Sequence, residues 1–95
     1  MLKRKKVELT YNEQKIILYA LIDFRNELLK ENKYADVVNE AIGKLKSKMK
    51  ADRYVIGVII NALNSKREKE VAEKQDTSTL DYLMLKLLKI YETLK

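Results

Sequence analysis

The side chains most able to bind a ligand in this 95-residue chain are cationic, and they gather in two short segments. One segment is residues 3–6 and the other is residues 44–53. Ammonium and guanidinium groups at this density attract nucleic-acid phosphates, acidic proteins or anionic membrane surfaces. The residues that we expect to contact an anion or a nucleic acid are Lys3, Arg4, Lys5, Lys6, Lys46, Lys48, Lys50 and Arg53.

The distribution of these charges favours a contact without base specificity. Residues 1–9 and 44–54 together carry nine cations and two carboxylates, a net +7, whereas the whole chain has a net charge of +6. Sixteen of the twenty cations are lysines, and no helix-turn-helix, zinc-finger or RNP motif is recognisable. A nucleic-acid contact would therefore be non-specific and salt-sensitive. The alternative is a lysine-rich, solvated end of the protein that binds nothing.

The residue types that most catalytic and metal sites use are missing. The chain has no Cys and no His, which excludes thiolate and imidazole metal sites and any pair of a nucleophile with a histidine. Glu27 and Glu31, like Glu68 and Glu70, lie among lysines, as carboxylates in surface ion pairs do. No glycine-rich loop is present to hold a phosphate. The sequence predicts a protein that is not an enzyme and has no metal or cofactor.

Apolar residues recur at helical spacing in four segments of a chain that has no Pro and only two Gly. Thr10 and Glu13 form a capping-box motif before the first segment, and Asp52 is a candidate N-cap before the third. Residues 6–9 alternate as a strand would, but they are too few to form a sheet alone. The predicted helices cover residues 10–31, 34–50, 52–74 and 78–94.

The sequence also aligns with itself at an offset of 42 residues without a gap. This offset places Thr10 on Asp52, so that both helix caps coincide, and the apolar stripes coincide as well. We interpret this as a duplicated helical hairpin; the alternative is four unrelated helices that share a periodicity. The predicted fold is all-α, a four-helix bundle in one domain, residues 1–95. Its parts are a basic N-terminal arm, residues 1–9, and two tandem antiparallel hairpins, residues 10–50 and 52–95.

Helix topology and helix amphipathicity point to two surfaces. In an antiparallel bundle, residues 1–9 and the turn between the second and third helices share one end, which we call the basic pole. The fourth helix has more apolar residues than one core-facing stripe needs, and a contiguous apolar patch marks association. Tyr82, Leu85 and Leu88 are therefore predicted to contact a protein partner or a second copy in a homodimer; isolated exposed leucines are the alternative.

The segment LTYNEQKIILYALIDFRNELLKENKYADVV, residues 9–38, resembles the small Lys/Glu/Asn-rich helical proteins of low-GC Gram-positive bacteria and their phages. The resemblance implies a protein that binds a host or phage protein as an inhibitor, antitoxin or regulator. We expect a non-enzymatic protein-binding module that occludes a partner; the alternative is a nucleic-acid-associated regulator that uses the basic pole.

No segment predicts a membrane span or a secretory leader. The longest apolar run, residues 16–22, is far shorter than the roughly 20 residues that a span requires. The basic N-terminus is followed by Glu8 rather than by the apolar run of a signal peptide. The expected location is the cytoplasm, or the host cytoplasm for a phage-encoded protein.

Overall fold

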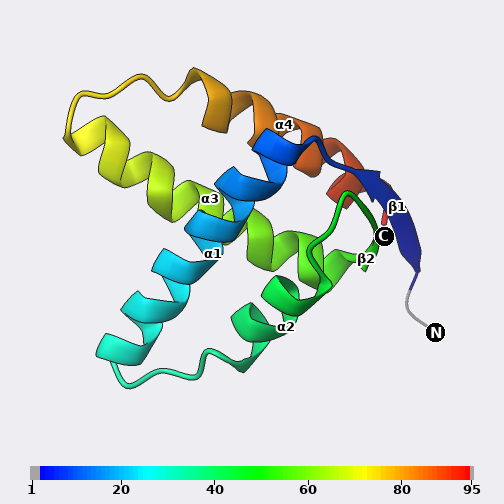
Figure 1. Cartoon of the computed structure of the whole chain (residues 1–95), viewed down its shortest axis with the longest axis horizontal. Coiled ribbons are helices and arrows are strands. Elements are labelled where there is room, and N and C mark those ends of the chain that lie inside the picture. The colour runs from blue at the N-terminus through cyan, green and yellow to red at the C-terminus, as the bar shows by residue number, and fades with distance from the viewer. Residues whose placement is uncertain (1–2, 95) are drawn as a thin grey trace.

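The computed structural model describes residues 3–94 and has four helices and two strands within that range (Figure 1). The four predicted helices are present. The all-α prediction is wrong in one respect, because two short strands pair as an antiparallel sheet. The elements in chain order are β1 Arg4–Glu8, α1 Tyr11–Lys30, α2 Asp36–Lys44, β2 Lys48–Asp52, α3 Arg53–Ala72 and α4 Ser78–Thr93.

The sheet replaces two predicted features: the free N-terminal arm and the last turns of the second helix. Residues 4–8 of the arm are β1, and α2 ends at Lys44, so that residues 48–52 are a strand rather than a helix end. Val7 lies opposite Met49 and both are buried. Residues 1–2 of the predicted arm lie outside the described residues.

The 42-residue offset appears in the boundaries of the elements. α1 and α3 are both 20 residues long, and α3 begins 42 residues after α1. After each of these helices one residue has a positive φ, Asn32 at 56° and Lys74 at 58°, again 42 positions apart. α2 and α4 also begin 42 residues apart, although α4 is longer. Val7 and Met49, which lie opposite each other in the sheet, are also 42 residues apart, so the strands pair at equivalent positions of the two halves.

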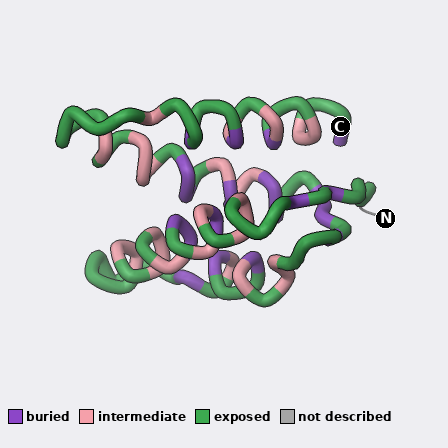
Figure 2. The backbone as a smooth tube through the Cα atoms, turned by 45° about the horizontal axis from the view of Figure 1, so that its top comes forward, coloured by how far each residue is buried: buried purple, intermediate pink, exposed green. Residues whose placement is uncertain are grey.

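The core lies between the helices and under one face of the sheet. α1 and α3 cross at the centre, flanked by α2 on one side and α4 on the other (Figure 1). Buried residues line the sides of the helices that face one another (Figure 2). The largest fully buried side chains are Ile17, Leu21, Ile56, Ile59, Leu63, Leu83, Leu87, Val7 and Val38.

Both predicted helix caps are confirmed and sit where each strand turns into its helix. The Thr10 hydroxyl accepts a hydrogen bond from the Glu13 N–H at 3.1 Å, and Glu13 accepts one from the Thr10 N–H at 2.9 Å. Asp52 is buried and accepts a hydrogen bond from the Val55 N–H at 2.9 Å. These caps satisfy backbone N–H groups that would otherwise be unpaired in the first turns of α1 and α3.

Candidate functional site

The antiparallel pair of β1 and β2, called here the ribbon, presents one face to the helices and the other to solvent. Val7, Met49 and Ala51 are buried on the inner face. Lys5 belongs to the same side, since its Nζ donates a hydrogen bond to Thr93 Oγ1 at the end of α4 at 3.0 Å. Side chains alternate along a strand, so the outer face carries the exposed residues Arg4, Lys6, Glu8, Lys48 and Lys50. Asp52 belongs to the same side and lies opposite Arg4, but it is buried where it caps α3.

The outer face has more cations than carboxylates. Lys6 lies directly opposite Lys50, and Glu8 lies opposite Lys48. Lys6 Nζ is 3.7 Å from Glu8 Oε1, whereas Lys48 and Lys50 form no ion pair with any residue in the described range. Like charges placed directly opposite each other destabilise a sheet. An anion at this face would relieve that repulsion.

The structure brings together most of the predicted basic pole, but it uses two of its members internally. Lys46 lies just before β2 and lines a hollow with Arg4 and Lys50. The guanidinium of Arg53 stacks on the ring of Tyr91, 4.2 Å from its centre, and the ammonium of Lys5 is held by Thr93, as described above. Lys3 precedes β1 and is exposed.

At one end of the ribbon, Lys86 of α4 is hydrogen-bonded to both β1 and α1. Lys86 Nζ donates hydrogen bonds to the backbone oxygen of Glu8 at 2.8 Å and to Glu13 Oε1 at 3.0 Å. Partial burial acts to raise the pKa of Glu13, but the Thr10 N–H and the Lys86 ammonium outweigh it and lower that pKa below its ordinary value. This end is therefore neutralised by contacts within the chain.

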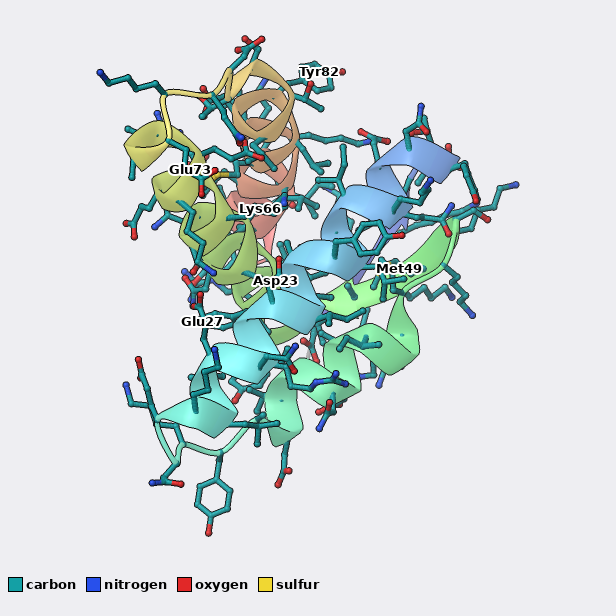
Figure 3. The ribbon with its side chains drawn as sticks, turned by 60° about the vertical axis from the view of Figure 1, so that its left-hand side comes forward. Asp23, Glu27, Met49, Lys66, Glu73 and Tyr82 are labelled. Carbon is teal, nitrogen blue, oxygen red and sulfur yellow. The ribbon has the colours of Figure 1, made fainter. Side chains whose placement is uncertain are left out.

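The predicted association surface on α4 is exposed. The exposed fractions are 69% for Tyr82, 53% for Leu85 and 37% for Leu88. Figure 3 shows Tyr82 pointing away from the helices. These side chains are thus available to a partner.

The carboxylates on the helices are partners of neighbouring cations. Glu27 pairs with Lys69 and accepts a hydrogen bond from Ser65 Oγ at 3.3 Å, which links α1 to α3. Figure 3 shows this polar side of the molecule, with Asp23 and Glu27 on α1, Lys66 on α3 and Glu73 directly after α3. Among the described residues, no three carboxylates are grouped so that they could hold a metal ion.

Sequence reasoning named the cations of the ribbon but missed the strands that order them. The signal was the alternation of residues 46–52, KSKMKAD, in which Met49 and Ala51 face inward. Comparison with known proteins gives no family: no family model, curated protein or solved structure matches the chain. None of the helices within residues 3–94 has the length and apolar character needed to cross a membrane.

Proposed function

We propose that the protein is a regulator that binds double-stranded DNA, with the ribbon in the major groove. The observation that carries this proposal is the outer face of the ribbon, where four of the five exposed side chains are cations, one buried carboxylate, Asp52, lies opposite Arg4, and Lys6 opposes Lys50. The two halves of the chain are proposed to be copies of one strand–helix–helix unit, joined so that their strands form a single ribbon.

The shape of the ribbon favours DNA over RNA. The major groove of B-DNA is about 12 Å wide and admits a two-stranded β-ribbon. Each strand has five residues, which is about 16 Å of extended chain. The major groove of A-form RNA is too narrow for side chains to read. A duplex in the B form is therefore the partner that fits this element.

The residue types on the outer face favour contacts to phosphates over base reading. Lysine and arginine donate to phosphate oxygens and also to guanine O6 and N7. The outer face, as described above, has no Asn or Gln, the side chains that pair with adenine. Base discrimination would therefore be limited to guanine, and salt would govern the affinity.

The proposal is tested by fluorescence anisotropy with a labelled 20-base-pair duplex between 50 and 200 mM salt. The five cations Arg4, Lys6, Lys46, Lys48 and Lys50 would neutralise about three to five phosphates. The slope of log K against log[salt] would then be about −2.7 to −4.5, an affinity loss of about 40- to 500-fold. A slope near zero, or no binding at 50 mM salt, would refute the proposal.

A matched pair of variants locates the contact. Lys6→Gln with Lys48→Gln should reduce the steepness of the slope by about 1.8. The control, Lys30→Gln with Lys33→Gln, removes the same charge from the loop region at the opposite end of the molecule (Figure 1). An equal effect of both variants would show that binding follows net charge and not the ribbon.

The exposure of Tyr82, Leu85 and Leu88 favours a second candidate function, a protein contact through α4. In this role the protein would be an inhibitor or regulator that occludes a partner, as its resemblance to small phage and bacterial helical proteins implies. A homodimer through the same surface is the simplest form of this contact.

A further inference from the structure

The two ends of the ribbon occupy equivalent places in the fold but carry different charges. A shift of 42 residues places each strand on the other one. Because the strands are antiparallel and Val7 pairs with Met49, this shift also places one end of the ribbon on the opposite end. The exchange is consistent along the strands, because the pair Lys6–Lys50 maps onto the pair Glu8–Lys48. The positions that exchange between the two ends are Lys6 and Lys48, Glu8 and Lys50, Gly43 and Leu85, and Lys44 and Lys86. Arg4 and Lys46 are also 42 residues apart, but both line a hollow at the same end.

One end contains a hollow of about 270 Å³ that we call the cationic hollow. Four cations line it, and Gly43 leaves room on its wall, since a Cβ at this position would meet nothing within 4 Å. The lining residues are Arg4, Gly43, Lys44, Lys46 and Lys50.

The surroundings of the cationic hollow do not balance its charge. One lining cation, Lys44, is paired, with Glu40 at 3.0 Å. The C-terminal end of α2, which ends at Lys44, adds about half a negative charge. The carboxylate of Asp52, which lies opposite Arg4 in the ribbon, is a further negative charge beside the hollow. Four positive charges therefore face about two and a half negative ones, and the excess positive charge attracts an anion.

The other end contains a hollow of about 400 Å³ that we call the neutral hollow. Its lining includes Glu8 and Glu13 as well as Lys48 and Lys86. Glu8 occupies the position that Lys50 occupies at the cationic hollow, and Lys86 is already hydrogen-bonded to Glu13. Two carboxylates thus compensate two ammonium groups.

We propose that the cationic hollow binds one backbone phosphate of the DNA duplex, and that Glu8, Glu13 and Lys86 at the neutral hollow bind none. This inference rests on the proposed function. Arg4, Lys46 and Lys50 share the single phosphate, with the guanidinium of Arg4 able to donate two parallel hydrogen bonds. The protein would then contact the two DNA strands unequally.

Exchanged lysines provide the first test, by anisotropy with the same 20-base-pair duplex. The salt slope of the parent should lie near −2.7, because three cations share one phosphate. Lys44→Gln should lower the affinity at 50 mM salt, because it removes a cation from the cationic hollow and leaves the Glu40 carboxylate unpaired beside the bound phosphate. Lys86→Gln should leave the affinity unchanged. Equal effects of the two substitutions would overturn the inference but not the proposed function.

A second measurement needs no variant and no DNA. Sodium phosphate is titrated into the ¹⁵N-labelled protein, and the amide resonances of exchanged positions are compared. Shifts at Gly43 and Lys44 without shifts at Leu85 and Lys86 support the inference, and equal shifts at both ends overturn it. If phosphate shifts only the cationic hollow but the parent fails to bind the duplex, the site is an anion site and both the proposed function and its DNA ligand are wrong.

Discussion

Repulsion between Lys6 and Lys50, which lie directly opposite each other, should lower the free energy of unfolding. Replacing Lys50 by a carboxylate should therefore stabilise the protein. In Lys50→Glu, a carboxylate would stand opposite Lys6, as Glu8 already stands opposite Lys48. An exposed cross-strand pair of opposite charges contributes about 0.2–1 kcal/mol, and like charges in the same place cost a similar amount. We expect the free energy of unfolding to rise by about 0.5–1 kcal/mol.

The same substitution two residues earlier provides a control of opposite sign. Lys48→Glu would put a carboxylate opposite Glu8 and convert an attraction into a repulsion. Both substitutions are from lysine to glutamate on exposed positions of one strand, so differences in strand propensity cancel. Lys48→Glu should lower the free energy of unfolding by about the amount that Lys50→Glu raises it.

Urea unfolding in a buffer without added salt, followed by circular dichroism at 222 nm, measures the free energy of unfolding of both variants. A gain of about 0.5–1 kcal/mol corresponds to a rise of about 2–8 °C in the melting temperature of a domain of this size. Both effects should vanish in 1 M NaCl, where the screening length is about 3 Å. Changes of the same sign in the two variants, or a gain that persists in 1 M salt, would refute the electrostatic reasoning. Lys50→Glu should also weaken duplex binding while it stabilises the fold.

Three further predictions concern the caps, the pH dependence and α4. Asp52→Ala should cost about 2 kcal/mol in urea unfolding and Thr10→Ala about 1 kcal/mol, because Asp52 is buried and Thr10 is exposed; equal losses would contradict this. The lowered pKa of Glu13 contributes stability that is complete above its ordinary pKa of 4.5 and is lost as the pH falls through the lowered value. In Glu13→Gln, the free energy of unfolding from urea titrations should therefore depend less on pH between pH 7 and 3, and an unchanged pH dependence would contradict this. Leu85→Glu with Leu88→Glu should preserve helicity and reduce the mass seen by light scattering if α4 forms a dimer; an unfolded variant would place both leucines in the core.

The helices could be predicted from the sequence because their signals are local. The Thr10–Glu13 motif and the stripe that follows it are contained within a few helical turns, and the cap at Asp52 with its own stripe gives a similar signal. The 42-residue offset was visible for the same reason, since caps and stripes coincide without a gap.

The strands could not be recognised in the same way, because each strand is stabilised by pairing with a segment far away in the sequence. Ile42, Leu45 and Met49 are spaced by three and four residues, which is helical spacing, and this extended the predicted second helix to residue 50. The competing signal, the alternation of Met49 with Ala51, spans too few residues to decide alone. It becomes decisive only when Val7, 42 residues away, supplies the opposing buried side chain.

The candidate site was therefore predicted in composition but not in arrangement. The hairpin model correctly brought residues 1–9 and 44–54 to one end, which placed Arg4 and Lys50 near each other. It gave no pairing, so the opposition of Lys6 to Lys50 was not foreseen. The internal roles of Lys5 and Arg53 also depend on α4, whose end lies beside the ribbon.

Joining both halves in one chain has a consequence for how the ribbon can evolve. A two-stranded ribbon is marginal alone and needs the helices of both halves to cover its inner face. In a symmetric dimer of one strand–helix–helix unit, each substitution would appear at both ends, so a carboxylate at position 8 would also replace the lysine at position 50. A single chain removes this constraint. Glu8 and Lys50 can then coexist, and one end can be neutralised by Glu13 and Lys86 while the other remains cationic. The charge difference between the ends is thus something that the covalent connection permits and that a symmetric dimer could not have.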